Sequence, residues 1–141
     1  MIISKAGTYD VSNEDVCIKT DGKITINVLG GDVKIKGVCK DIELKIIHKS
    51  SANSNVVIRG KDAKIHITGI ADQGSVYIEA GSLYKGDVLA ALEIGGDVKA
   101  EHKAYTLNVS DDLLFYLATR GLSKEEARKI FEESFLKMCK C

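Results

Sequence analysis

The sequence predicts a mainly β protein of short strands that ends in two helices. Three observations predict this fold class: short alternations of apolar and polar residues recur along the chain, turn residues separate them, and two capped amphipathic segments follow. The alternations that begin at residues 24, 33 and 42 are nine residues apart, and so are those at 56 and 65. Short strands at near-constant spacing are typical of a β-sandwich or a β-solenoid, and the spacing alone favours neither.

The strands are predicted from short sets of apolar residues that share one face, because successive side chains of a strand point to opposite sides. In chain order these sets are Ile24/Ile26/Val28, Val33/Ile35, Ile42/Leu44/Ile46, Val56/Ile58, Ile65/Ile67, Val76/Ile78, Val88/Ala90, Leu92/Ile94 and Val98/Ala100. Val11 and the stretch 16–18 are candidates for the first strands. The turns between the sets are rich in Gly, Asp and Asn. Only Asp21-Gly22 is a strong hairpin dipeptide, whereas an antiparallel sandwich needs several.

The two helices are predicted from their caps. The first begins after Ser110, whose hydroxyl can accept a hydrogen bond from a free N–H of the first turn, and it ends at Gly121. The second begins after Ser123, and Glu126 stands at the spacing of a capping box. One face of the second helix is apolar and contains Ala127, Ile130, Phe131, Phe135 and Met138. This face must pack on the β body, on a partner, or on both.

The composition excludes several classes of protein. The 141 residues include 20 basic and 20 acidic side chains without a basic block, so we expect neither nucleic acid nor an anionic membrane as a partner. No apolar run approaches the ~18 residues of a membrane span, and residues 1–5 lack the pattern of a signal peptide. A cytoplasmic location is therefore expected. The four cysteines are accordingly predicted to be reduced thiols.

The cysteines divide into two kinds. Cys17 and Cys39 lie in or beside apolar sets, where a cysteine usually serves as a small core residue. Cys139 and Cys141 end the chain beside two lysines, which can favour the thiolate. One hypothesis is that this Cys-x-Cys tail captures iron or sulfur; the alternative is a disordered tail with two exposed thiols. Two ligands alone do not complete a metal site.

The tail from residue 92 onward resembles the C-terminal end of the SufB/SufD family, the β-helical scaffold proteins of iron–sulfur cluster assembly. The similarity is carried by Glu101-His102-Lys103-Ala104, by the run Asp112-x-Leu114-Phe115-Tyr116-Leu117-x-x-Arg120-Gly121, and by Glu126-Ala127 with Phe135. A weaker similarity reaches back to residues 48–60, so that the resemblance covers 48–138.

The resemblance implies a short right-handed parallel β-helix over residues 1–109. A two-helix hairpin over 110–138 would cap its C-terminal end, and the Cys-x-Cys tail would occupy 139–141. It implies a scaffold component of iron–sulfur cluster assembly that is not itself an enzyme. The alternative is a structural or oligomerisation module that kept the β-helix but lost the cluster chemistry.

The resemblance also implies a site and its cargo. His102 and Glu101 would hold iron or a transient iron–sulfur cluster at a subunit interface, and imidazole is a suitable ligand for iron. Three features depart from the family pattern: Lys103 follows the histidine where one branch has a glutamate, Ala100 replaces a cysteine found in the other, and residues 81–86 contain no cysteine. A cluster normally needs thiolate ligands, so these departures favour a site completed by a second subunit.

The partners implied by the resemblance are a SufC-like ABC-type ATPase and a second subunit. The ATPase would bind the helical hairpin, with Phe115, Tyr116, Phe131 and Phe135 as anchors and Arg120 beside them. The second subunit would be a copy of this chain or a SufB/SufD relative, giving a homodimer or a heterodimer.

Overall fold

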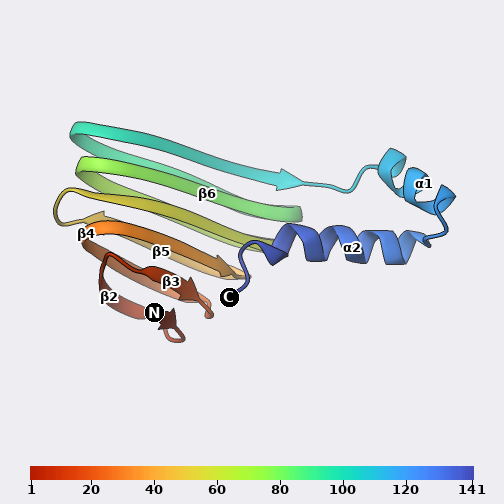
Figure 1. Cartoon of the computed structure of the whole chain (residues 1–141), viewed down its shortest axis with the longest axis horizontal. Helices are drawn as coiled ribbons and strands as arrows, with labels where there is room; N and C mark the ends of the chain where they lie inside the picture. The colour runs from red at the N-terminus through yellow and green to blue at the C-terminus, as the bar shows by residue number, and fades with distance from the viewer.

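The computed structural model describes all 141 residues as a parallel β-solenoid from which two helices project (Figure 1). The paired strands all run parallel, so the prediction of a parallel β-helix is confirmed and the antiparallel sandwich is excluded. Strand β6 is not one straight segment but winds through successive turns of the solenoid. The strands are β1 (Ile2–Ile3), β2 (Gly7–Ser12), β3 (Asp15–Ile18), β4 (Gly22–Val38), β5 (Asp41–His48) and β6 (Ala52–Leu107).

The register explains the nine-residue spacing of the sequence. Gly22 of β4 pairs with Ile42 of β5, and Gly31, in the second half of β4, pairs with Ala52 of β6. One turn of the solenoid therefore takes about 20 residues and contains two of the predicted apolar sets, one on each side.

The core is a stack of aligned apolar side chains between these two sides. Ile24 lies in register with Leu44, and Leu44 with Ile67, and all three are buried. The same alternation continues through a core of 24 buried residues, which confirms the apolar faces predicted over residues 24–78, whereas Ile94 and Ala100 of the last two predicted sets are exposed. Burial of each such side chain stabilises the fold by about 1.5–3 kcal/mol relative to leaving it exposed.

Glycine is required where the chain turns a corner between the two sides. Gly31 and Gly74 adopt backbone φ angles of 75° and 92°, which other residues rarely accept. A Cβ atom on Gly74 would lie 1.9 Å from the carbonyl oxygen of Ala52 in the preceding turn. The corner at this position therefore depends on glycine for both its backbone angle and its close packing.

The last turn of the solenoid, formed by residues 97–107 of β6, has no later turn above it (Figure 1). Ile94 near this end is consequently 46% exposed, and Leu107 at the end of β6 is 39% exposed. Stacked strands of this kind leave an edge whose backbone groups can pair with another chain.

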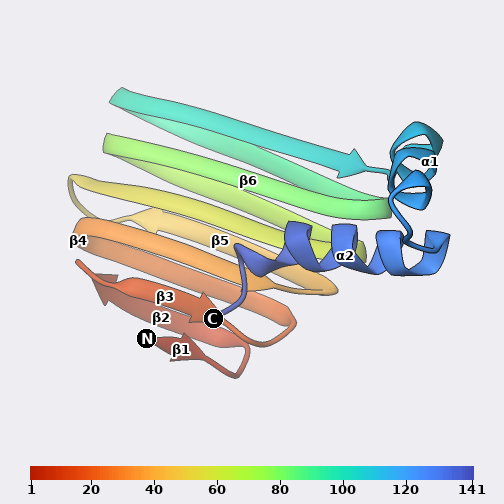
Figure 2. The ribbon, with the colours of Figure 1, turned by 45° about the vertical axis from the view of Figure 1, so that its right-hand side comes forward.

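The two helices are α1 (Asp111–Thr119) and α2 (Lys124–Lys137), and together they form what we call the helical arm. Their predicted caps are confirmed: the Ser110 and Ser123 hydroxyls each accept a hydrogen bond of 3.1 Å from the backbone N–H three residues later. Figure 2 shows α2 running back toward the solenoid, so that the chain ends beside β3. The arm thus leaves the edge of the last turn open. Neither helix combines the length and the apolar composition that crossing a membrane requires.

Candidate functional site

The predicted site residues Glu101 and His102 lie on the exposed last turn of the solenoid. Lys103 and Tyr105 of this turn contact Glu79, and Glu101 lines a groove on the same outer side. His102 lies between these outward-facing residues, so strand alternation directs it to the opposite, inner side. It is nevertheless exposed, because no later turn covers it. His102 therefore stands at the open end of the solenoid.

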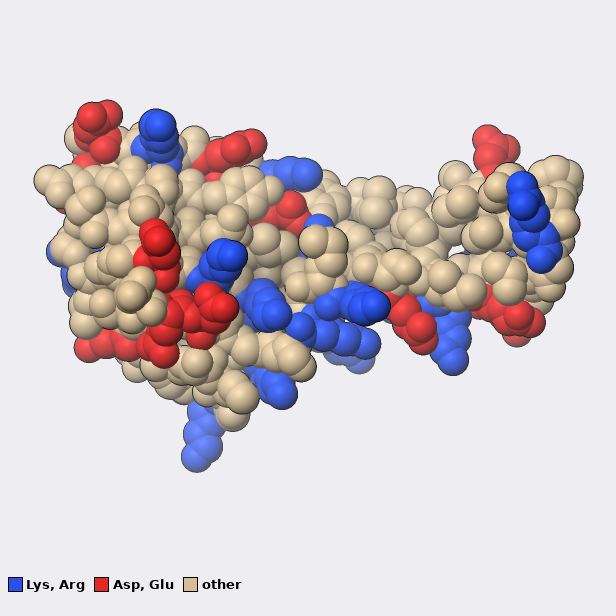
Figure 3. All heavy atoms as spheres, in the orientation of Figure 1, with Lys and Arg blue, Asp and Glu red and all other residues tan.

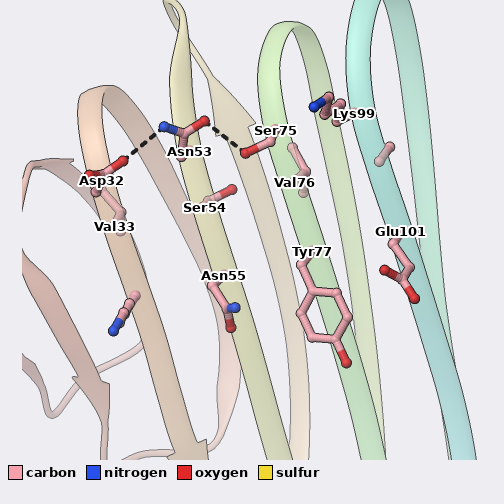
Figure 4. Close-up of a pocket in the computed structure, with 12 residues that line it drawn as sticks. Asp32, Val33, Asn53, Ser54, Asn55, Ser75, Val76, Tyr77, Lys99 and Glu101 are labelled. Carbon is pink, nitrogen blue, oxygen red and sulfur yellow. Dashed lines mark hydrogen bonds between the residues drawn. The ribbon is translucent and has the colours of Figure 1, made fainter.

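The groove beside Glu101 has a volume of about 500 Å³ and crosses successive turns of the solenoid (Figure 4). Its floor carries a polar ladder in which the Asn53 amide donates to Asp32 Oδ1 at 2.8 Å and the Ser75 hydroxyl donates to Asn53 Oδ1 at 2.7 Å. Tyr77 and Glu101 continue the lining toward the last turn. The polar side chains of this ladder hydrogen-bond to one another across successive turns, so they stabilise the stacking of the turns.

A buried carboxylate lies next to this groove and holds the last turn in place. Glu79 accepts hydrogen bonds from the Tyr77 hydroxyl at 3.0 Å, from the Tyr105 hydroxyl at 3.0 Å, and from Arg59 Nε and Nη2 at 3.2 and 3.1 Å. Lys103 Nζ lies 3.9 Å from Glu79 Oε1, the oxygen that also accepts from Tyr77. Burial by itself would raise the pKa of Glu79, but these hydrogen bonds outweigh burial and hold the pKa below its ordinary value.

Tyr105 shows the opposite shift in the same cluster. Its burial, followed by the negative charge of Glu79, raises the pKa of Tyr105 to about 12. The hydroxyl therefore stays protonated and donates to Glu79 throughout the ordinary pH range. The cluster joins three consecutive turns, because Arg59, Glu79 and Tyr105 each come from a different pass of the chain.

Arg59 also binds the base of the helical arm. Its Nη1 donates to the Phe135 carbonyl oxygen at 2.9 Å, and its guanidinium lies 4.7 Å from the centre of the Phe135 ring. Tyr105 meets the same ring edge-on, with the ring centres 6.3 Å apart. A second contact is made by Glu132, which accepts from Tyr84 at 2.7 Å and pairs with Lys61 at 3.2 Å. The arm is thus linked to the strand that carries His102.

The predicted partner-binding residues divide between the two helices of the arm, with Phe115, Tyr116 and Arg120 on α1 or its end and Phe131 and Phe135 on α2. Phe115 is 72% exposed and Tyr116 is 51% exposed, and the exposed Arg120 guanidinium lies 4.9 Å from the centre of the Tyr116 ring. Phe131 is half-buried, and Phe135 is buried against Arg59 and Tyr105. Figure 3 shows the arm projecting beyond the solenoid body, so its exposed aromatic residues are accessible.

The oxidation state of the cysteines differs from the one predicted from the sequence. The prediction of four reduced thiols is wrong, because Cys17 and Cys141 form a disulfide. The winding of the chain brings the C-terminus beside β3, a proximity that the sequence spacing does not reveal. Cys39 is buried as predicted. Cys139 is also buried, and burial raises the pKa of its thiol above the ordinary value, so this tail is ordered and presents no thiolate pair.

Residues 48–54 hold a histidine with a defined tautomer. His48 Nδ1 lies 3.4 Å from the Gln73 carbonyl oxygen, to which it can only donate, so Nε2 accepts from the Ser54 hydroxyl at 2.6 Å. Burial lowers the pKa of His48, which favours this neutral form.

No group of three or more His, Cys, Asp or Glu side chains in the structure is arranged to hold a metal ion. The geometry therefore gives His102 and Glu101 as isolated candidates for ligands.

Sequence reasoning missed the cluster of Arg59, Glu79 and Tyr105. These residues occupy outward positions of the alternation, where polar side chains are ordinarily solvated. Their partners lie 20 to 76 residues apart, so no short-range pattern signals the contact. Arg59 was marked only by the weaker similarity over residues 48–60.

Comparison with known proteins finds a family similarity over the last turn of the solenoid and most of the helical arm. The family model for the SUF system FeS cluster assembly SufBD core domain matches residues 91–135. Iron–sulfur cluster assembly SufBD family proteins from Staphylococcus aureus (strain USA300), Staphylococcus saprophyticus and Staphylococcus epidermidis are each 28% identical over 117 residues. The aligned part is 72% of this chain and 25% of each relative, so the chain spans about a quarter of their length. No solved structure gives a significant match.

Proposed function

We propose that this chain, which is related to the SufBD family, is a cytoplasmic scaffold component of iron–sulfur cluster assembly that acts with an ABC-type ATPase and is not itself an enzyme. The observation that carries the proposal is the family match over residues 91–135, which includes both the last turn with His102 and the helical arm. The cluster around Arg59 and Glu79 supports it, since it links these two parts.

The open end of the solenoid supports a contact with a second subunit. Ile94 and Leu107 expose apolar surface there, and the last strand offers an unpaired edge. A copy of this chain or a SufB/SufD relative would cover this surface and place His102 at the seam. Iron or a transient iron–sulfur cluster is then the cargo, held by the His102 imidazole and ligands of the second subunit, whereas the predicted ligand Glu101 points to the outer side and away from this seam.

The exposed face of the helical arm supports binding of the ATPase. Phe115 and Tyr116 present two aromatic side chains next to Arg120, the residue types that most often dominate binding energy at interfaces. Phe131 is half-buried, and Phe135 anchors the arm to the solenoid. A displacement of the arm by the ATPase would reach the last turn through Phe135, Arg59 and Tyr105.

The experiment that tests this proposal is a pull-down with a SufC-like ATPase. The intact chain should be retained, and the double variant Phe115→Ala/Tyr116→Ala should lose binding. Lys124→Ala, on an exposed position of the same arm, is the matched control and should bind as the intact chain does. Equal retention of all three proteins, or of none, would contradict the proposed docking surface.

A structural or oligomerisation module is the second candidate. Lys103 favours it, because a cation next to His102 opposes the binding of iron. Both functions use the open end of the solenoid as an interface. Binding of iron and sulfide by the protein distinguishes them, because only the scaffold is expected to bind both.

A further inference from the structure

The two ends of the chain are joined at one point. Cys17 of β3 is buried, whereas Cys141 is exposed, and the two are bonded although 124 residues separate them. Their Cα atoms are 6.0 Å apart, which lies within the range found for disulfides. The bond therefore closes the tail that follows α2 onto one of the first strands of the solenoid (Figure 2).

The helical arm has little else to hold it. Its buried residues are Leu114, Ala127 and Phe135, whereas each turn of the solenoid buries several large apolar side chains. The polar contacts of the arm with the solenoid come from its last two turns, at Glu132 and Phe135. The rest of the arm projects from this base (Figure 1). An element with few buried contacts opens more readily than the core, so a covalent link at its base has a large effect on its motion.

Reagents in solution reach this bond from one side only. Cys141 is exposed, while Cys17 and the two free cysteines, Cys39 and Cys139, are buried. Burial, followed by the charges of Asp21 and Cys139, raises the pKa of Cys39 to about 12. Because the thiolate is the attacking form, the free thiols are poor competitors for exchange with this bond.

We propose that the Cys17–Cys141 disulfide is a redox-responsive tether of the helical arm, and that Cys141 is the site at which a dithiol exchanges with it. One thiolate of the dithiol attacks Cys141 Sγ, the S–S bond breaks, and Cys17 leaves as a thiolate that takes up a proton. The second thiol of the reagent then attacks the mixed disulfide and releases Cys141 as a thiol. The dithiol is oxidised to its disulfide, and the protein disulfide is reduced to two thiols.

Reduction leaves the solenoid intact, because its core and strand pairing do not involve this bond. It removes the covalent link between the tail and β3 and leaves the arm held by non-covalent contacts, namely those of Arg59, Lys61, Tyr84 and Tyr105 and the burial of Cys139. The oxidised protein thus has a fixed arm and the reduced protein a mobile one. This inference concerns the arm itself and does not depend on the identity of the bound ATPase.

The test is hydrogen–deuterium exchange of the intact chain before and after treatment with dithiothreitol. Alkylation before reduction should leave Cys17 and Cys141 unmodified. Reduction should speed exchange of the amides in 111–139 at least about tenfold and leave those in 24–67 unchanged. Cys141→Ser should show fast exchange of the arm in both conditions, whereas Cys39→Ser, the matched control, should respond as the intact chain does.

Three results would overturn the tether. Alkylation of Cys17 and Cys141 without reductant would show that the bond does not form. Equal exchange of the arm before and after reduction would show that the bond does not restrain it. Zinc or iron bound at these thiols, found by metal analysis and released by a chelator, would show a metal link instead. Because no ATPase is present, each result is independent of the proposed function.

Discussion

Arg59 and Phe135 are 76 residues apart in sequence, yet Arg59 Nη1 donates a 2.9 Å hydrogen bond to the Phe135 carbonyl oxygen. The same guanidinium binds Glu79, which also accepts from Tyr105 on the last turn of the solenoid. One cation therefore connects the base of the helical arm with the strand that carries His102. Four predictions follow from the packing and charges of this fold.

Arg59→Ala should destabilise the protein by about 3 kcal/mol, because it removes the hydrogen-bonded cation of the buried Glu79 carboxylate and leaves only Lys103, at 3.9 Å. The loss is measured as the free energy of unfolding in urea, followed by circular dichroism. Lys64→Ala removes a cation from an exposed strand position and should change stability by less than about 0.5 kcal/mol. Equal stability of the two variants would show that the Arg59 contacts are not formed in solution.

The stability should fall in acid because of Glu79. Its folded-state pKa lies below the ordinary value of 4.5, so the stabilisation is complete above that value and is lost as the pH falls through the folded pKa. Glu79→Gln should be less stable than the intact chain at neutral pH and should show a shallower loss below pH 4.5. The check is urea unfolding repeated over a pH series, and parallel curves for the two proteins would refute the assignment.

Leu44→Ala should cost about 2–5 kcal/mol, because it opens a cavity between Ile24 and Ile67 in the middle of the stack. Lys45→Ala changes the neighbouring, outward side chain and serves as the control. Thermal unfolding of the two variants measures the difference. A loss below about 1 kcal/mol for Leu44→Ala would mean that this stack is not packed as described.

Gly74→Ala should be more harmful than Gly121→Ala. Both glycines have positive φ, at 92° and 90°, so both substitutions carry a backbone cost of about 1–2 kcal/mol. Only the new Cβ at residue 74 would meet backbone, 1.9 Å from the Ala52 carbonyl oxygen, whereas no atom lies within 4 Å of that at residue 121. Urea unfolding of both variants checks the order, and a similar loss for the two would contradict the close packing of the corner.

The parts of the fold that the sequence predicts are those set by local chemistry. The period-two alternation predicts buried residues such as Ile24 and Ile67 because side-chain direction in a strand is fixed by position. Ser110 and Ser123 predict the helix starts because a cap is satisfied within three residues. The alternation is equally compatible with two β architectures, and the family resemblance favoured the parallel one that the structure has.

The parts that the sequence does not predict depend on which turns become neighbours. Arg59 and Glu79 meet because they lie one turn apart, and their outward positions look like ordinary solvated sites in the sequence. Cys17 and Cys141 meet because the tail returns along the solenoid, although the expected compartment argued for reduced thiols. Long-range proximity of this kind has no signature in residue spacing.

We propose that the open end of this solenoid holds iron–sulfur cargo through His102 when a second subunit covers it. The direct measurement is anaerobic reconstitution with iron and sulfide, followed by visible absorption and by analysis of bound iron and sulfide. We expect a cluster spectrum in a protein eluting as a dimer, and its loss in His102→Ala but not in the control His66→Ala. A chain that binds no iron and sulfide, alone or with a SufB/SufD relative, or a cluster that survives in His102→Ala, would show that His102 does not hold this cargo.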